Sequence, residues 1–189
     1  MKPEHKREFG RQTVHIIVAF ILIVLLFALG TFKFMALLFF GILSGALLIN
    51  WMSLGSKIPI ADWFHSKFER PNVRFPGYGS AWYAVGVLLM TVFLQDPSKI
   101  AAGIIVLGIG DGLSTIVGLN YGKNKIPYNP KKSVEGSLAF FLSSLLSYFF
   151  IGPSALLLAF ISTLIESLPI ELDDNLSIPI VVTVILKFV

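Results

Sequence analysis

One aspartate stands inside a strongly apolar part of the chain, in the run GIGDGLSTIVGLNYGK that starts at Gly108. A carboxylate at membrane depth is energetically costly, and such residues usually have a function. Asp111, Thr115, Gly118 and Gly122 follow one another at intervals of four, three and four residues, so they share one face of a helix. Close helix packing explains the glycines, but it does not explain the acid. We therefore interpret Asp111 as a functional residue.

A lysine-rich segment comes next and ends where another helix is predicted to begin. The start of a helix attracts anions because its N–H groups are free and its dipole is positive there, so lysines before it favour a phosphate site. Glu135 would repel a bare phosphate, so it fits best if it pairs with a lysine or holds a divalent cation. No Walker A sequence is present, and any nucleotide site must be built differently from a P-loop. The segment contains Lys123, Lys125, Lys131, Lys132, the candidate helix cap Ser133, Glu135 and Gly136.

Further polar residues fall near the same predicted membrane boundary. Glu166 lies on an otherwise apolar helix, and Asp174 and Asn175 follow it in a loop, where capping of the last helix is an alternative role. Arg11 and His15 lie four residues apart on the first helix. They either belong to an ordinary basic N-terminal cap or bind a phosphate or orient a carboxylate. Acids that hold a divalent metal, surrounded by cations, are what phosphoryl transfer requires.

The elements that must position these residues are membrane helices. The 189 residues are 55% hydrophobic and only 14% charged, whereas soluble domains carry about 25% charged residues. Since about 20 apolar residues span a bilayer, we predict an all-α, polytopic integral membrane protein with a single transmembrane domain over residues 1–189. The absence of cysteine excludes disulfides, thiolate metal sites and cysteine nucleophiles. The seven predicted segments cover about 13–29, 34–50, 77–94, 100–119, 134–151, 153–168 and 176–189.

The distribution of positive charge predicts the orientation. Twelve of the 15 Lys and Arg residues fall in the N-terminus and in loops 51–76 and 120–133, and loop 169–175 lies on the same side. By the positive-inside rule this side is cytoplasmic, and it holds the candidate site. The basic residues are thus topology signals, and nucleic-acid binding is not expected. Loop 51–76 is also expected to carry a short amphipathic helix in the headgroup region, starting at Pro59.

Four motifs in this order resemble the dolichol kinase family, which includes CTP-dependent diacylglycerol kinases and phytol kinases. They are GDGLSTIVGLNYGK, KKSVEGSLAFF, the glutamate of STLIES, and DDNLSIP. The N-terminal RQTVH is similar to the family's basic-basic-x-x-His element, with Gln12 in place of the second basic residue. The resemblance covers the chain from Gly108 to Pro179.

This resemblance implies transfer of the γ-phosphate of CTP, or of ATP, to the hydroxyl of a membrane lipid, with Mg²⁺ or another divalent cation. Asp111 or Glu166 would act as base, and the metal ligands would come from Asp111, Glu135 and Asp174. The lysines would neutralise the phosphates. The implied nucleotide-binding residues are Arg11, His15, Gly118, Gly122, Lys123, Lys131, Lys132, Ser133, Gly136 and Asn175.

Two other functions compete with this interpretation. A CTP-dependent cytidylyltransferase that makes a CDP-lipid needs the same nucleotide and metal, but releases pyrophosphate. A small ion-coupled transporter would use Asp111 and Glu166, although no convincing repeat relates the two halves of the chain and a lysine-rich loop suits a nucleotide better. The sequence leaves open whether the acceptor is a polyprenol, another isoprenoid alcohol or diacylglycerol, and whether the protein is a homodimer.

Overall fold

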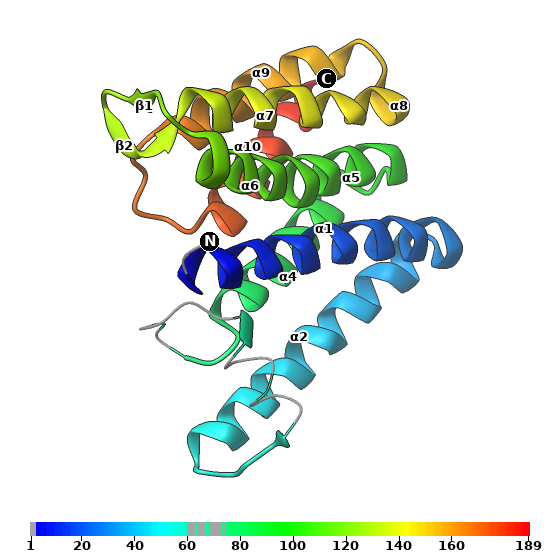
Figure 1. Ribbon diagram of the computed structural model, residues 1–189. Coiled ribbons are helices and arrows are strands. Elements are labelled where there is room, and N and C mark those ends of the chain that lie inside the picture. Colours follow the sequence, from blue (N-terminus) through cyan, green and yellow to red (C-terminus); the bar gives the residue numbers. More distant parts are fainter. Residues whose placement is uncertain (1–2, 60–62, 64–66, 69–72, 74) are drawn as a thin grey trace.

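The computed structural model describes residues 3–59, 63, 67–68, 73 and 75–189. Over these residues the chain is helical, apart from one small two-stranded sheet (Figure 1). This confirms the predicted all-α class. Most of the amphipathic helix predicted after Pro59 lies outside the described residues.

The first two helices form an antiparallel pair. α1 (Pro3–Leu29) and α2 (Thr31–Ser53) meet at Gly30, whose φ of 76° is strained for residues with a side chain. From this turn α2 diverges from α1 and packs against α4 (Figure 1). Only Phe34 and Leu38 of α2 are buried, so most of its apolar side chains face outward.

The helix that carries Asp111 lies at the centre of the protein. α4 (Tyr78–Leu94) precedes it, and Asp96 then caps α5 (Pro97–Ile104) by accepting a hydrogen bond from the backbone of Ser98. A π-helix over Ile105–Gly110 continues α5 and leads directly into α6 (Asp111–Tyr121). Such insertions occur frequently at functional sites. Asp111 therefore follows a rare local distortion in the most buried helix.

The second half of the chain packs around this central helix. The sequence predicted a plain loop over 120–133, but Lys125 pairs with Ser133 and Ile126 with Asn129 in an antiparallel hairpin. Ser133 caps the next helix as predicted, because its Oγ accepts a hydrogen bond from Gly136 N. The remaining elements are β1 (Lys125–Ile126), β2 (Asn129–Ser133), α7 (Val134–Ser144), a 3₁₀ turn (Leu145–Ser147), α8 (Tyr148–Ile151), α9 (Ser154–Ser167) and α10 (Asp174–Phe188).

The last helix begins earlier than the sequence suggested. Asp173 caps it by accepting a hydrogen bond from the backbone of Asn175, so neither Asp174 nor Asn175 is the cap. Pro179 consequently lies in the second turn of α10. Gly86 of α4 allows close packing there, since a side chain would strike the Asn175 carbonyl and the Pro179 ring. This packing fixes the start of α10 beside α4.

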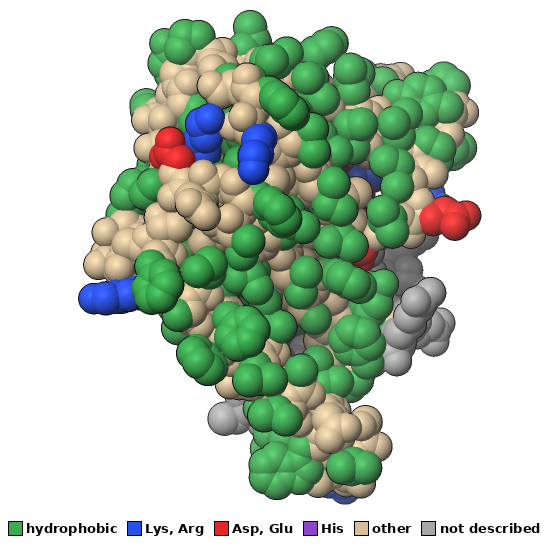
Figure 2. Space-filling model, turned by 180° about the vertical axis from the view of Figure 1, so that it is seen from behind, with side chains coloured by type: hydrophobic (Ala, Val, Ile, Leu, Met, Phe, Trp, Pro, Cys, Tyr) green, Lys and Arg blue, Asp and Glu red, His purple; other side chains and the backbone are tan. Residues whose placement is uncertain are grey.

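Length and composition agree with a membrane protein. Within the described part of the chain, four helices are long and apolar enough to cross a bilayer, namely those over His5–Leu29, Thr31–Ser53, Pro97–Tyr121 and Val134–Ile151. Two shorter apolar helices cover Tyr78–Leu94 and Ser154–Ser167. The face in Figure 2 is dominated by hydrophobic side chains and shows few charged ones. The count of seven spans and their orientation stay predictions.

Candidate active site

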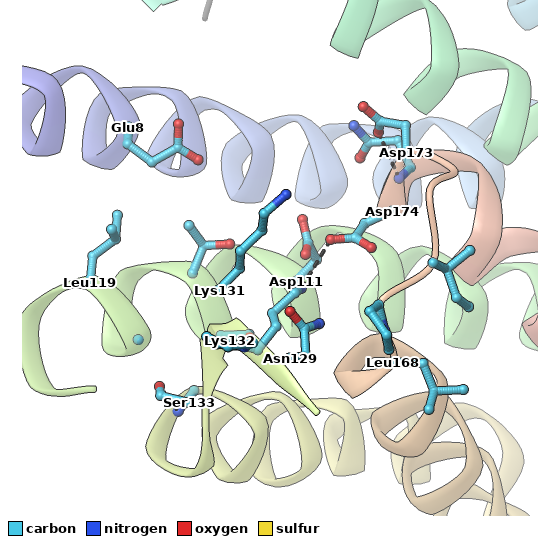
Figure 3. Close-up of a pocket in the computed structure, with 18 of the residues that line it drawn as sticks. Glu8, Asp111, Leu119, Asn129, Lys131, Lys132, Ser133, Leu168, Asp173 and Asp174 are labelled. Carbon is cyan, nitrogen blue, oxygen red and sulfur yellow. Dashed lines mark hydrogen bonds and ion pairs between the residues drawn. The ribbon is translucent and has the colours of Figure 1, made fainter. Parts of the chain in front are cut away.

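A large pocket opens at one end of the helices (Figure 3). The N-terminus and the hairpin both lie at this end (Figure 1). Its volume is about 1420 Å³. The wall combines the first turns of α1, one face of α6, the hairpin, the start of α7 and the loop between α9 and α10. Asp111, Thr115 and Gly118 all contribute to it, as their predicted common helix face requires. Residues far apart in sequence therefore share one cavity.

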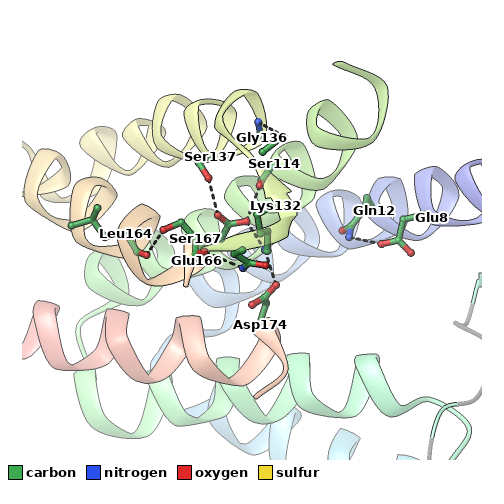
Figure 4. Close-up of polar contacts among 12 residues, drawn as sticks. Glu8, Gln12, Ser114, Lys132, Gly136, Ser137, Leu164, Glu166, Ser167 and Asp174 are labelled. Carbon is green, nitrogen blue, oxygen red and sulfur yellow. Dashed lines mark hydrogen bonds and ion pairs between the residues drawn. The ribbon is translucent and has the colours of Figure 1, made fainter. Parts of the chain in front are cut away.

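Lys132 is at the centre of the charged groups. It lies on β2, and its Nζ donates to Oε1 of Glu166 at 2.5 Å and to Oδ2 of Asp174 at 3.0 Å (Figure 4). Burial alone would lower the pKa of Lys132, but the carboxylates of Asp174, Glu166 and Asp111 together raise it above its usual value. The ammonium group is therefore held positively charged in the pocket wall.

Glu166 is fully occupied by its neighbours. Its side chain is completely buried, and besides Lys132 it accepts hydrogen bonds from Ser114 Oγ at 3.0 Å and from Ser137 Oγ at 3.3 Å. These donors come from α6 and α7, so one carboxylate joins three helices and the hairpin (Figure 4). A buried charge needs such partners. The geometry suits a residue that positions Lys132.

Asp111 and Asp174 differ from Glu166 because they face the open pocket. Asp111 is 6% exposed, and no residue in the described part of the chain donates a hydrogen bond to it. The side chain of Asp174 is 38% exposed. Figure 3 shows the two carboxylates close together, with Lys132 beside them. Both have oxygen atoms available to a ligand.

Asp111 and Asp174 could hold a magnesium ion, although they do not form a site in which protein side chains supply all the metal ligands. The described residues contain no cluster of three or more His, Cys, Asp or Glu side chains that could hold a metal. Mg²⁺ does not require one, because it usually binds one or two carboxylates and completes its shell with water and phosphate oxygens. Asp111 and Asp174 supply the type and number of ligands that such an ion needs.

Five residues predicted for the site do not line the pocket, namely His15, Gly122, Lys123, Glu135 and Glu166. Glu135 is partly exposed and accepts hydrogen bonds from the backbone N–H groups of Lys123 and Asn124 at 3.2 and 3.1 Å. Neither Glu135 nor Lys123 lines the pocket. Gly122 does not line it either, and a side chain there would strike the carbonyl of Gly118. Glu135 thus fixes the base of the hairpin in this structure.

The start of α7 does face the pocket, as the phosphate-site prediction requires. Ser133 and Gly136 line the cavity, together with Lys131 from the hairpin. Gly136 allows this turn to approach α6, since a side chain there would crowd the carbonyl of Ser114. The helix terminus and two lysines, Lys131 and Lys132, therefore border the same space.

The N-terminal element divides between the pocket and the interior. Arg11 lines the pocket and forms an ion pair with Glu8, with Nη2 2.5 Å from Oε1. Gln12 is buried, and its Nε2 donates to the same Glu8 oxygen at 3.2 Å. His15 does not line the pocket but packs edge-on against Tyr83, with ring centroids 4.0 Å apart.

Tyr83 is a residue that the sequence reasoning missed. It is 5% exposed, its hydroxyl has no hydrogen-bond partner in the described structure, and it packs against Gly108. Asp111 interacts with it electrostatically. Asn175 lies on the same side of the pocket and donates to the carbonyl of Gly79 at 3.3 Å. A tyrosine within an uncharged apolar span was the only sequence signal, and it is a weak one.

The hairpin tip contributes a second missed feature. Tyr128 OH lies 2.9 Å from Ser167 Oγ, and Asn129 Nδ2 donates to the carbonyl of Ser167 at 3.0 Å. These bonds join the hairpin to the end of α9. They hold Lys132 in register with Glu166, and no sequence motif marked them in advance.

Comparison with known proteins identifies relatives. The chain is 35% identical over 186 residues to an uncharacterized protein of Methanocaldococcus jannaschii, covering 96% of this chain and 93% of that one. It is 36% identical over 124 residues to phytol kinase 1, chloroplastic, of Arabidopsis thaliana, covering 54% of this chain. It is 30% identical over 198 residues to probable phytol kinase 2, chloroplastic, of Oryza sativa subsp. japonica, covering 93% of this chain.

The alignments cover 40% of the Arabidopsis phytol kinase and 64% of the rice protein, so this chain spans only part of the length of these plant relatives. No protein-family model matches the chain, and no solved structure matches it significantly.

Proposed function

The chain belongs to the polyprenol and phytol kinase family, and from this premise we propose that it is a membrane lipid kinase that transfers the γ-phosphate of CTP, or of ATP, to the hydroxyl of an isoprenoid alcohol. The phytol kinases among its relatives favour an isoprenoid acceptor over diacylglycerol. The observation that carries the proposal is the position of Lys132 among three carboxylates at the wall of a large pocket. Phosphoryl transfer depends mainly on such positioning and charge neutralisation.

In the proposed reaction the hydroxyl oxygen of the alcohol attacks the γ-phosphorus. The bond from this phosphorus to the β–γ bridging oxygen breaks, and the nucleoside diphosphate leaves. Asp111 accepts the hydroxyl proton, since its carboxylate faces the pocket with no hydrogen-bond donor among the described residues. Glu166 is a poor base in this arrangement because Lys132, Ser114 and other donors already occupy it. Its role is to hold Lys132.

The phosphates would lie against the positive part of the wall. Lys132 and Lys131 would neutralise phosphate oxygens, and the N–H groups at the start of α7 would donate to them. Arg11 reaches the same space from α1. A divalent cation held by Asp111 and Asp174 would supply further neutralisation of the phosphate oxygens. The proposal puts this pocket on the cytoplasmic side, where most Lys and Arg residues are predicted to lie.

The test uses purified protein in lipid vesicles with Mg²⁺, γ-labelled CTP or ATP, and phytol, geranylgeraniol or diacylglycerol as acceptor. We expect label in an isoprenoid monophosphate and release of a nucleoside diphosphate. Asp111→Asn should reduce the rate by at least about a thousandfold, because it removes the proposed base and a cation ligand. Unchanged thermal unfolding would show that the loss is not a loss of folding.

Two results would contradict the proposal. Full activity of Asp111→Asn would remove this residue from the chemistry. Release of pyrophosphate with formation of a CDP-lipid would instead identify a cytidylyltransferase. The second result needs a lipid phosphate as acceptor, so the panel includes phosphatidic acid as a separate arm.

A further inference from the structure

The wall of the pocket is divided by chemical type. One part carries the positive side chains of α1 and the hairpin, including Arg11, Lys131 and Lys132. The other part is the loop over residues 168–172, which joins α9 to α10 and reads LPIEL. All five of its residues line the pocket. Figure 3 shows Leu168 on one side of Asp111 and Asp174, and Glu8 and Lys131 on the other.

The apolar side chains of this loop are not used in the core. Leu168, Ile170 and Leu172 are 43%, 41% and 55% exposed, although each also borders the cavity. They therefore form a rim between the pocket and the outside of the protein. The helices on either side of the loop, α9 and α10, are rich in apolar residues, so the rim continues an apolar surface into the pocket.

The loop is held at both ends, so this rim is a formed surface. Ser167 at its start receives hydrogen bonds from Tyr128 and Asn129 of the hairpin. Asp173 at its end caps α10. The next residue is Asp174, which binds Lys132 at the centre of the proposed chemistry. A chain lying on the rim would thus place its head group beside Asp111 and Asp174.

We propose that loop 168–172 is the binding site for the hydrocarbon tail of the acceptor alcohol, with Ile170 and Leu172 determining the preference for long tails. This inference rests on the proposed kinase function and assigns the second substrate to a place within the same pocket. The nucleotide occupies the positive part, and the two substrates meet at Asp111 and Asp174. Apolar contacts with each segment of the tail add to the binding of long alcohols only.

The test compares Ile170→Ser/Leu172→Ser with the wild type in kinase assays on phytol and on short, water-soluble prenol. The double variant should lower kcat/KM for phytol by about tenfold or more, since small changes in apolar pockets commonly have effects of this size. Activity on prenol and the KM for the nucleotide should change less than about twofold. The conservative pair Ile170→Leu/Leu172→Ile should retain the preference for phytol.

Leu54→Ser/Phe149→Ser is the matched control, because these side chains are 77% and 82% exposed and neither lines the pocket. It should leave the preference unchanged. Equal losses with phytol and prenol would overturn the proposal. A raised KM for the nucleotide with an unchanged preference for phytol would also overturn it, because the loop would then bind the nucleobase. If the wild type phosphorylates no alcohol, the kinase function itself fails. Crosslinking with a photoreactive phytol analogue then decides separately whether the loop binds the tail.

Discussion

Two clusters of buried polar residues lie at the wall of the pocket or behind it, and they differ in how far their hydrogen bonds are satisfied. The hairpin cluster contains Lys132 and Glu166 with their serine donors, and these groups bind one another. The inner cluster lies between α1, α4 and the start of α10. It contains His15 and Asn175 together with two polar atoms that have no partner in the described structure, Gln12 Oε1 and Tyr83 OH.

The two clusters would therefore contribute to catalysis in different ways. Charged groups that already hold one another need little rearrangement when a phosphate arrives, which is the condition for electrostatic stabilisation of a transition state. Buried polar atoms without partners carry a cost in the free protein, and they regain hydrogen bonds when water or a ligand reaches them. We therefore expect substitutions in the hairpin cluster to affect stability and activity together, and those in the inner cluster to affect activity alone.

The largest effect should come from Lys132→Met. The change leaves the carboxylates of Glu166 and Asp174 facing one another without a cation. Because Lys132 and Asp174 are partly exposed, we expect a cost below that of breaking a fully buried pair, which is about 3–5 kcal/mol. Activity should fall at least about a thousandfold, and the unfolding temperature should fall as well. Both are measured on protein in the same detergent. Lys33→Met is the control, because Lys33 does not line the pocket.

Glu166→Gln should have the next largest effect. The amide keeps the shape of the side chain but removes the charge that holds Lys132, while Ser114 keeps an oxygen to donate to. We expect kcat to fall about a hundredfold with little change in the nucleotide KM, because the lysine loses its position relative to the reacting phosphate. A variant with wild-type kcat would mean that Glu166 does not position Lys132.

Asp174→Asn and Glu135→Gln separate a cation ligand from a structural acid. Asp174 faces the pocket, whereas Glu135 binds backbone groups outside it. The Mg²⁺ concentration for half-maximal activity should rise about tenfold or more in Asp174→Asn and stay unchanged in Glu135→Gln. The opposite pattern would support the metal role that the sequence suggested for Glu135. Titration of activity with Mg²⁺ at saturating nucleotide distinguishes the two.

Tyr83→Phe should have the smallest effect and tests the inner cluster. Removing a buried hydroxyl that has no partner should leave the unfolding temperature unchanged or slightly raised. If the Tyr83 hydroxyl acts on the candidate site through Asp111, kcat should still fall about threefold to tenfold. Tyr148→Phe is a matched control, because Tyr148 is exposed and does not line the pocket. Equal activity of the two variants would show that the inner cluster takes no part.

Much of the candidate site could be predicted from the sequence. Asp111, Lys132 and Asp174 were identified from residue type and spacing, and the structure brings them to one pocket. The same reasoning grouped Glu135 with them, because it stands in the first turn of a helix beside lysines. It could not foresee that the carboxylate turns toward the backbone of Lys123 and Asn124. The orientation of the Glu135 carboxylate depends on the hairpin, and the short strands of the hairpin have no strong periodic pattern in the sequence.

Asp111 shows where the boundary lies. The sequence alone determined that this chain is an all-α protein with apolar helices, and it singled out a carboxylate on the fourth apolar segment as a candidate functional residue, because composition and the cost of burying charge are local properties. Only the tertiary structure decided that Glu166 holds Lys132, that Tyr83 and His15 lie behind the pocket, and that loop 168–172 forms its apolar rim. Such contacts join residues distant in sequence, and they follow from the packing of the helices against one another rather than from spacing along any one of them.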